Sequence, residues 1–462
     1  MDPLLSFISE VKRKSGKERP RIGLFGVGKT NTVILSKLRE LGIKTVIRSD
    51  ADRLPGGISQ GSDAVYTGDH SLDEVCEDAI IFSPSVRRER SALALARKRG
   101  VIFSSDTEMF FGLKPQNVFS VTGSDGKSTV TYMTSRLLSL GGRFTEVFPS
   151  GNFGIPFASL SGDEASAYVA ELSSFNLHYL TPHSTRAAIT CITPNHLNWH
   201  SSMNEYVSDK LRILSDAEEV VLPLDGGICE DYAKAHGAFA LFSSKKTAKQ
   251  MSQIAKAELY ISFEGGSILI NGKSILGGDD LDKIKGHNIE NLMCSIGLSY
   301  GLVGDECARR LARDFSGLPH RCQTVGNFGG VCFINSSIDT TPARTATTLS
   351  TLDKTVILIL GGRTKGVPLT DAIPLIARYA KSLHIYGECR SEFLSELFDD
   401  PRTRTIPTTS SDSFKDAFCE AARSAAVGDT VLLSPAATAY GEFRNFEERG
   451  EVFCHMAKSN ED

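Results

Sequence analysis

Short apolar segments rich in Val and Ile alternate with amphipathic helical patterns along most of this 462-residue chain. Strands that are buried on both faces read as continuous apolar runs, so the alternation favours parallel α/β sheets covered by helices. The expected strands cover residues 21–28, 44–50, 79–85, 117–123, 187–193, 355–362, 383–388 and 430–436. The clearest expected helices cover residues 30–41, 88–100, 369–381 and 414–426.

Composition narrows the class of protein. The net charge of -4 does not favour nucleic acid as the main partner. No run of eighteen apolar residues indicates a membrane span, and the N-terminal residues lack the order of a signal peptide. The ten cysteines are scattered without a C-x-x-C pair, which favours a reducing cytoplasm over a disulfide or zinc framework.

The segment "VTGSDGKSTVT" (121–131) follows an expected strand and resembles a phosphate-binding loop. Backbone N–H groups at a helix start favour an anion, and Lys127 adds a positive charge. Ser128 or Thr129 could place a hydroxyl on Mg2+. A glycine turn that happens to contain a lysine is the less favoured interpretation.

Two further segments carry polar groups at strand ends. Glu171 ends an apolar strand, where a carboxylate could hold the Mg2+ of a nucleotide. After "NHLNWH" (195–200), Ser202 and Glu205 form a capping-box pattern that predicts a helix start near Met203. On that helix Lys210 falls within the apolar arc, so it either snorkels to solvent or turns inward toward a metal or phosphate.

Other candidates are weaker. Asn288 and Asn291 lie one turn apart at a helix start, where they could face one ligand or simply cap the helix. Arg321 lies at an expected hinge, and Lys365 follows an expected strand. In "GLFGVGKTN", Asn31 occupies the third glycine position of a dinucleotide-binding fingerprint, so the segment indicates only an anion-binding turn.

The expected boundaries between domains are "FFGLKPQN" (110–117) and "DFSGLPHRCQTV" (314–325), and the second precedes a hairpin-like stretch. We expect three α/β domains, over residues 1–113, 114–318 and 319–462. The first and last are expected to be Rossmann-like, and the central one P-loop ATPase-like.

Taken in order, these motifs resemble those of the Mur ligase family of ATP-dependent amide-forming enzymes. The family's shorter loop, G-x-x-G-K-[ST], is present as "GSDGKST" (123–129). The similarity continues in "ELSSF", "NHLNWH", "GHNIEN", "GLPHR" and "SPAATAYGEFRNFEERG", and the last is most similar to members that add D-glutamate. The resemblance implies a cytoplasmic, monomeric ligase that joins D-glutamate to UDP-N-acetylmuramoyl-L-alanine in peptidoglycan synthesis, using ATP and two Mg2+ ions.

The resemblance also implies residue roles. ATP would contact Gly123, Ser124, Asp125, Gly126, Lys127, Ser128, Thr129, Asn288, Asn291 and Arg321. The UDP-linked substrate would contact Gly26, Val27, Gly28, Lys29, Ser49, Asn152, Ser173 and Asn176, and D-glutamate would contact Thr340, Lys365 and Phe446. The metal ligands would be Ser128, Glu171, His196 and Lys210, with Lys210 carbamylated by CO2. Lys127, His196 and Lys210 would be the catalytic residues.

The sequence departs from the family pattern at several positions. Asp125 replaces a frequent Asn, Asn176 a usual Gln, Ile338 a frequent Lys and Ala439 a Ser that contacts glutamate. These departures affect the amino-acid pocket more than the ATP chemistry.

Three alternatives remain open. A folylpolyglutamate synthase or sibling Mur ligase would keep the same loop, although the D-N-P-R type segment of the diaminopimelate- or lysine-adding sibling is not seen. An NAD-linked oxidoreductase would use "GLFGVG" but leave the Lys127 loop unexplained. A catalytically silent nucleotide-binding protein would bind the same phosphates without turnover.

Overall fold

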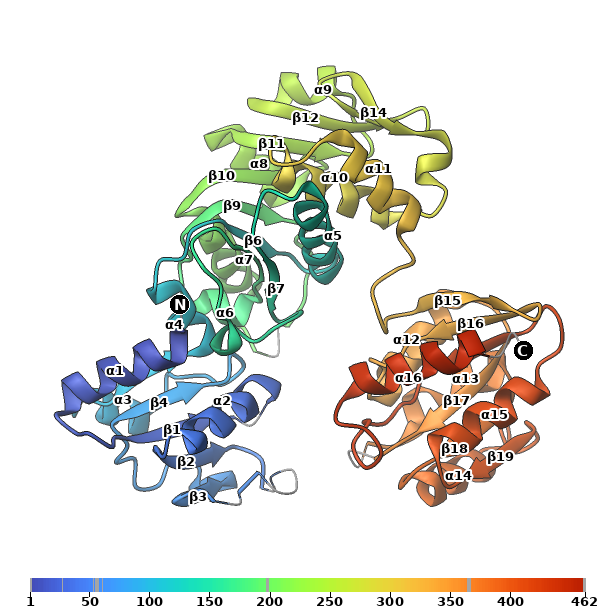
Figure 1. The fold of residues 1–462 in the computed structure, drawn as a ribbon, viewed down its shortest axis with the longest axis horizontal. Coiled ribbons are helices and arrows are strands. Elements are labelled where there is room, and N and C mark those ends of the chain that lie inside the picture. Colours follow the sequence, from blue (N-terminus) through green and yellow to red (C-terminus); the bar gives the residue numbers. More distant parts are fainter. Residues whose placement is uncertain are drawn as a thin grey trace. The chain divides into compact units, whose positions relative to one another are not determined.

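The computed structural model describes residues 2–459, except 27, 53, 55–57, 60, 197–198 and 364–366 (Figure 1). The chain divides into two compact units, Met1–Asp314 and Phe315–Asp462. Three sheets, all dominated by parallel strands, confirm the predicted α/β fold class. Among the described residues, no helix combines the length and apolar character that crossing a membrane requires.

The first sheet of unit 1 is fully parallel, with the order β3-β2-β1-β4-β5. Its strands are β1 (Arg21–Phe25), β2 (Lys44–Ser49), β3 (Ala64–Thr67), β4 (Ala79–Phe82) and β5 (Ile102–Ser105). The helices of this part are α1 (Pro3–Ser15), α2 (Lys29–Glu40), α3 (Ser91–Lys98) and α4 (Asp106–Gly112). The chain order reverses at β1, so the glycine turn after β1 lies where ligands of open α/β sheets bind.

The second sheet of unit 1 has the order β14-β13-β12-β11-β10-β9-β6-β8-β7. Its strands are β6 (Val118–Thr122), β7 (Val147–Gly151), β8 (Ala167–Glu171), β9 (Ser184–Ile189), β10 (Ala217–Pro223), β11 (Ala238–Ser243), β12 (Ala257–Glu264), β13 (Ser267–Ile270) and β14 (Lys273–Gly277). β13 and β14 are antiparallel additions. Because β6 lies between β8 and β9, the loops that follow these three strands meet at one edge of the sheet.

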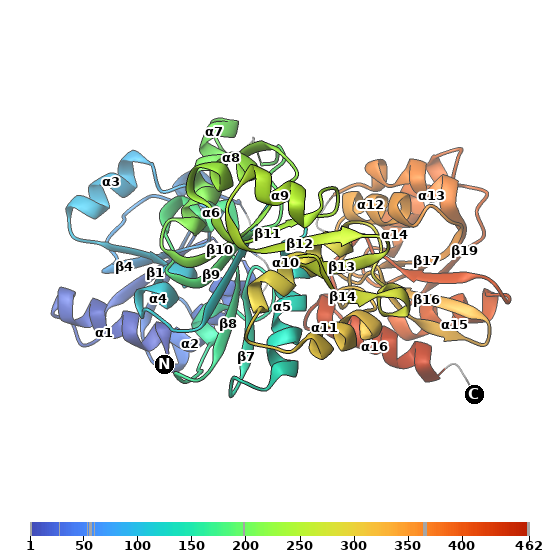
Figure 2. The ribbon, with the colours of Figure 1, turned by 90° about the horizontal axis from the view of Figure 1, so that it is seen from above.

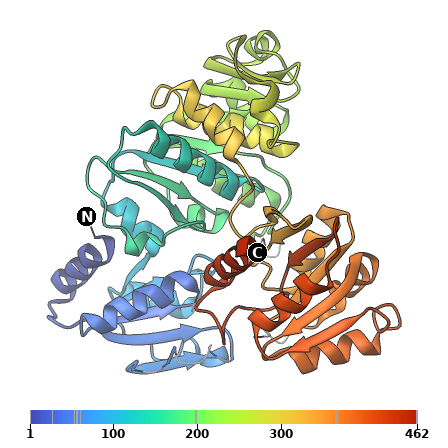
Figure 3. The ribbon, with the colours of Figure 1, turned by 45° about the vertical axis from the view of Figure 1, so that its right-hand side comes forward.

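Helices cover both faces of this second sheet. They are α5 (Lys127–Gly141), α6 (Ser174–Tyr179), α7 (Met203–Leu211), α8 (Gly227–His236), α9 (Ala248–Ile254), α10 (His287–Ser299) and α11 (Asp305–Asp314). Figure 2 shows α8 and α9 on one side of the strands and α5 and α11 on the other, and α5 (teal) crosses the sheet in Figure 3. α5 and α10 pack against each other, which places the starts of both helices near the phosphate loop.

Unit 2 contains one sheet with the order β15-β16-β20-β17-β18-β19, in which β15 alone is antiparallel to its neighbour. Its strands are β15 (Gln323–Phe328), β16 (Val331–Asn335), β17 (Val356–Gly361), β18 (Ala380–Tyr386), β19 (Thr408–Ser411) and β20 (Thr430–Leu433). Its helices are α12 (Pro342–Leu352), α13 (Ile373–Tyr379), α14 (Arg390–Asp399), α15 (Phe414–Ser424) and α16 (Phe446–Lys458).

All eight expected strands and four expected helices are present, but two helices begin later than predicted. The expected helix over 88–100 begins at Ser91, because the preceding arginines are extended and bind Glu108 and Asp50. The expected helix over 369–381 begins with a separate 3-10 turn. The predicted boundary near residue 113 falls between β5 and β6, within one compact unit, and the division into three domains stays a prediction.

Helix α1 was missed by the sequence reasoning. Its Asp2 cap accepts hydrogen bonds from Leu4 N and Leu5 N, and Leu4, Phe7 and Val11 are buried against the first sheet. Their spacing of three and four residues after an Asp-Pro pair was the available signal.

Candidate active site

The phosphate loop joins β6 to α5, the predicted strand–loop–helix context. Gly126 adopts a left-handed conformation (φ 79°) directly before α5. Gly123 also has positive φ, and a Cβ added there would overlap Thr190 Oγ1. Thr190 directly follows β9, and its hydroxyl donates to Asp125 O, which holds the loop in place. Because the Thr190 side chain lies so close to position 123, only glycine fits there.

Two lysines meet at this loop. Lys127 Nζ donates to Gly123 O and Ser124 O, both at 2.9 Å. Lys210 Nζ donates to the same Gly123 O at 2.7 Å, and Lys210 is only 2 % exposed. Burial, followed by the nearby Lys127 charge, lowers the pKa of Lys210 to about 7. Of the two alternatives for Lys210, the structure therefore favours the inward-facing side chain over one that snorkels to solvent.

Helix α7 positions Lys210. It begins at Met203, as predicted, with the Ser202 side chain accepting from Glu205 N. The Glu205 carboxylate does not return the bond to Ser202, because it accepts from Ser201 N instead. The most deeply buried side chains of α7 are Tyr206, Asp209 and Lys210. The buried face of α7 thus contains Lys210 together with Tyr206 and Asp209.

A cavity of about 390 Å3 opens beside the two lysines. Its walls come from both sheets of unit 1 and consist of Ser83, Pro84, Ser85, Gly123, Lys127, Asn152, Ser173, Ser174, Phe175, His196, Tyr206 and Lys210. The structure therefore brings together predicted ATP, metal and UDP-substrate residues. Phe175 and Tyr206 had no predicted role of their own. Tyr206 could have been found because it precedes Lys210 by one helical turn.

Glu171 and His196 complete the proposed metal region. Glu171 ends β8 and is 4 % exposed, and its carbonyl accepts from Asn152 N at 3.2 Å. His196 has an uncommon positive φ of 54°, and its ring packs on Phe175. Desolvation and the charges of Lys127 and Lys210 lower the pKa of His196, which favours the neutral ring. A neutral ring has a nitrogen lone pair that can bind a metal ion.

The candidate metal ligands can be compared with the groups that usually bind Mg2+ in proteins. The described residues contain no group of three His, Cys, Asp or Glu side chains that could hold a metal ion by itself. Mg2+ is usually bound by one or two carboxylates together with substrate phosphates, rather than by an all-protein cage. One carboxylate at Glu171 and a hydroxyl at Ser128 in the first turn of α5 fit that pattern.

The start of α10 borders a second, smaller cavity. It has a volume of about 90 Å3 and is lined by Asp125, Gly126, Thr190, Cys191, Phe242, His287, Glu290, Asn291 and Cys294. Asn291 Nδ2 donates to Asn288 Oδ1 at 3.1 Å, so the two amides share one side of the helix. The residue that caps α10 is Gly286, without a side-chain hydrogen bond, so the capping interpretation of Asn288 is wrong.

The glycine turn of the first sheet lies on β1. Gly26 has positive φ, and a Cβ there would press on Ser83, whereas Gly28 caps α2. The buried Asn31 side chain donates to Gly26 O and Phe25 O and so holds the turn in place. In a dinucleotide-binding fingerprint the position of Asn31 is a glycine. Ser49 ends β2 and is buried. Val27 and the side chain of Lys29 lie outside the described residues.

Ser173 and Asn176 form a reciprocal capping box at the start of α6. Asn176 Nδ2 also donates to Thr107 Oγ1 on α4 at 2.8 Å. Ser124 is similarly engaged, since its hydroxyl contacts Thr193 and Tyr206. Asn176 and Ser124 therefore hold the site together, and their predicted ligand contacts stay predictions.

The predicted D-glutamate residues lie in unit 2. Thr340 follows β16, and Phe446 begins α16, where its carbonyl accepts from Ser337 Oγ. Lys365 lies outside the described residues. A cavity of about 280 Å3 near the ends of β18 and β20 is lined by Gly362, Tyr386, Gly387, Glu388, Arg390, Asp412, Ala439, Tyr440, Gly441 and Glu442. Thr340 and Phe446 are not among its lining residues. Arg321, the last predicted ATP contact, is an exposed residue of unit 2.

Sequence reasoning missed Arg449, which joins the loops of unit 2. Its side chain is fully buried on α16. It donates to Ser337 Oγ and O, to the carbonyls of Gly361 and Ala437, and to the Tyr386 hydroxyl. Four strand ends therefore depend on one guanidinium. The available signal was the spacing of Arg449, Phe453 and Ala457, which lie four residues apart on one helix face.

Comparisons with known proteins agree with this architecture. The Mur ligase middle domain pattern matches residues 121–299. The UDP-N-acetylmuramoylalanine--D-glutamate ligases of Acetivibrio thermocellus and Ruminiclostridium cellulolyticum are each 32 % identical, with 99 % of both chains covered. The corresponding Clostridium perfringens protein is 31 % identical over 95 % of this chain and 96 % of its own.

Solved structures share the fold at lower identity. UDP-N-acetylmuramate-alanine ligase MurC of Thermotoga maritima has a TM-score of 0.52 at 17 % identity, covering 96 % of this chain and 100 % of its own. MurF of Acinetobacter baumannii has a TM-score of 0.50 at 13 % identity, covering 98 % of each chain. With full-length relatives above 30 % identity, this chain belongs to the Mur ligase family.

Proposed function

We propose that this protein is an ATP-dependent ligase that joins D-glutamate to UDP-N-acetylmuramoyl-L-alanine through an acyl phosphate, a cytoplasmic step of peptidoglycan synthesis carried out by a monomer. The observation that carries the proposal is the cavity in which Lys127 and Lys210 share Gly123 O beside Asn152 and Ser173. The full-length relatives named for this reaction support the choice of substrates.

The chemistry requires activation of a carboxylate. Its oxygen attacks the γ-phosphorus of ATP, an O–P bond forms and the bond to ADP breaks. The amine of D-glutamate then attacks the carbonyl carbon, and phosphate leaves with the former carboxylate oxygen. Lys127 and the N–H groups of the Gly123–Gly126 loop stabilise the phosphate charge that moves in both steps. The cavity walls shield the acyl phosphate from water.

Family membership implies ATP and Mg2+, and the finer metal assignment is part of the proposal. Ser128 and Glu171 would hold one Mg2+, and His196 with carbamylated Lys210 the second. When bound, the ions neutralise phosphate charge and polarise the reacting oxygens. A pKa near 7 leaves much of Lys210 as a free amine at neutral pH, which can add to CO2 with loss of a proton.

The remaining roles follow the family resemblance. Asn288, Asn291 and Arg321 would contact the nucleotide of ATP. The turn at Gly26 and Gly28, with Ser49, would contact the UDP moiety. Thr340, Lys365 and Phe446 would contact D-glutamate. No second function is favoured, because Asn31 fills the turn that a dinucleotide-binding site would need to keep open.

Phosphate release by the purified protein tests the proposal. Release should require ATP, UDP-N-acetylmuramoyl-L-alanine and D-glutamate together, and omission of any one should reduce it to background. Equal rates with L-glutamate, or with a folate in place of the UDP-linked substrate, would assign the chain to another amide ligase. Phosphate release from ATP in the absence of both UDP-N-acetylmuramoyl-L-alanine and D-glutamate would indicate a simple nucleotidase.

A further inference from the structure

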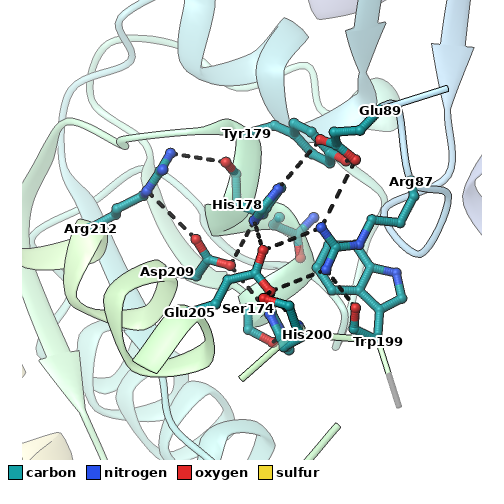
Figure 4. A network of polar contacts seen from close by, with 12 residues as sticks. Arg87, Glu89, Ser174, His178, Tyr179, Trp199, His200, Glu205, Asp209 and Arg212 are labelled. Carbon is teal, nitrogen blue, oxygen red and sulfur yellow. Dashed lines mark hydrogen bonds and ion pairs between the residues drawn. The ribbon is translucent and has the colours of Figure 1, made fainter. Parts of the chain in front are cut away.

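A cluster of polar side chains lies behind the cavity wall and joins α6, the loop before α7, α7 itself and residues 87–89 (Figure 4). Its buried centre is Asp209, whose side chain is 3 % exposed. One carboxylate oxygen of Asp209 lies 2.8 Å from His178 Nδ1 and 3.4 Å from His200 Nδ1. The proposed function assigns no role to Asp209, His178 or His200.

His200 connects the two walls of the cavity. Its side chain is fully buried, and its Nε2 lies 3.0 Å from Ser174 Oγ. Ser174 stands between Ser173 and Phe175 in the cavity wall, while Asp209 directly precedes Lys210. His200 therefore bonds the start of α6 through Ser174 and packs on Tyr206 of α7, one helical turn before Lys210.

The same three residue types form the nucleophilic triad of serine hydrolases, but the geometry does not suit that role. A nucleophilic hydroxyl must face the substrate. Ser174 is 1 % exposed, and the 3.4 Å separation leaves His200 Nδ1 without a hydrogen bond in the described structure. The connection is better suited to holding two elements at a fixed spacing.

A second set of contacts fixes the same loop to the first sheet. Arg87 stacks on Trp199, 3.9 Å from the ring centre, and donates to both carboxylate oxygens of Glu205. Trp199 Nε1 donates to Ser85 O in the cavity wall at 2.8 Å. The Arg87 hydrogen bonds hold the pKa of Glu205 at about 2, so this contact is charged at neutral pH. Trp199 is the chain's single tryptophan, and its ring packs against His200.

We propose that His200 is a positioning residue that sets the distance between the Ser173–Phe175 turn and Lys210. This inference rests on the proposed function, because those two walls would hold the UDP-linked substrate and the metal region. Its bond to Ser174 is shielded from water, so no solvent molecule substitutes for the imidazole. A displacement of about 1 Å at a reacting group can cost on the order of 10²-fold in rate.

Two matched variants test the proposal. Glutamine places its amide near the position of Nε2, whereas asparagine places it near Nδ1. Because Nε2 carries the Ser174 contact, His200→Gln should keep kcat within about threefold of the parent, and His200→Asn should lose about 10–100-fold. The KM for ATP should stay within about twofold in both variants. His183→Gln, at an exposed histidine before β9, is the control and should match the parent.

Ser174→Ala removes the same bond while keeping the imidazole, and should lower kcat as His200→Asn does. Acrylamide quenching of Trp199 fluorescence, measured without nucleotide or metal, gives an independent readout. His200→Gln should match the parent, and His200→Asn and Ser174→Ala should both be quenched more strongly.

Parent-like kcat and quenching in Ser174→Ala, or equal losses in His200→Gln and His200→Asn at unchanged Tm, would overturn the inference. If the parent protein releases no phosphate with the proposed substrates, the proposed function fails, and the quenching comparison still decides the positioning role.

Discussion

The candidate sites of the two units both lie at the carboxyl edges of parallel sheets, but their cationic side chains have different partners. In unit 1, Lys127 and Lys210 donate to carbonyl oxygens, and neither forms an ion pair among the described residues. In unit 2, the exposed Arg363 and Arg390 already pair with Glu388 and Asp412. Among the residues that the structure describes, the buried Arg449 donates to neutral carbonyl and hydroxyl oxygens.

This difference indicates how each unit meets an anion. The lysines of unit 1 are not neutralised by carboxylates, so a polyphosphate and its metal can supply the missing negative charge. In unit 2 an acidic amino acid must compete with Glu388 for Arg363, or use another cation such as Arg344 or Lys365. We therefore expect the more highly charged ligand, the polyphosphate with its metal, to bind unit 1.

The largest effect is expected at Lys210. Lys210→Ala should lower kcat by on the order of 10²–10³-fold, because an electrostatic group at the reacting phosphate is lost. Circular dichroism should show a folded protein, since Ser202 still caps α7. Added acetate should restore part of the activity by occupying the vacated oxygen site. Lys210→Arg activity equal to the parent would show that the residue acts only as a cation.

The stability of unit 1 should depend on pH through Asp106. Burial raises the pKa of Asp106 to about 6 from an ordinary 3.8, although its carboxylate accepts from Phe157 N and Ala158 N. The folded state therefore holds the proton more tightly, so this stabilisation is present below about pH 4 and lost as pH rises through 6.

The free energy of unfolding of unit 1, relative to Asp106→Asn, should fall by roughly 3 kcal/mol over that range. Denaturant titrations from pH 4 to 7 measure this difference. An identical pH slope in the parent and in Asp106→Asn would contradict it.

Arg449 tests the pocket of unit 2. Arg449→Lys keeps the charge but cannot reach four strand ends with one ammonium. The KM for D-glutamate should rise about tenfold, comparable to losing one buried hydrogen-bonding group. The KM for ATP should be unchanged. Equal increases in both KM values would show that Arg449 supports the whole protein rather than this pocket.

The smallest effect is expected at Glu388. Glu388→Gln should free Arg363 and lower the KM for D-glutamate about two- to threefold, the range typical of an exposed ion pair. Asp400→Asn, which breaks a comparable exposed pair with Arg402, should leave that KM unchanged. A higher KM in Glu388→Gln would mean that the pair itself shapes the pocket.

The same contrast explains how far sequence reasoning reached. The unit 1 loop is contiguous, so strand, glycines and Lys127 could be recognised together, and the helical arc of α7 placed Lys210 among the residues that could turn inward. The Arg87–Glu205 contact could not be predicted, because it joins residues 118 positions apart. In unit 2, Arg449 bonds groups at four strand ends that are far apart in the sequence, and no local pattern encodes that arrangement.

The central claim is that the unit 1 cavity activates a carboxylate by phosphorylation. UDP-N-acetylmuramoyl-L-alanine labelled with oxygen-18 in its free carboxylate tests this claim directly. Mass spectrometry should find one labelled oxygen in each phosphate released during D-glutamate addition, because phosphate leaves with a former carboxylate oxygen. Unlabelled phosphate, with product still formed, would contradict the acyl phosphate and with it the proposed role of the Lys127–Lys210 site.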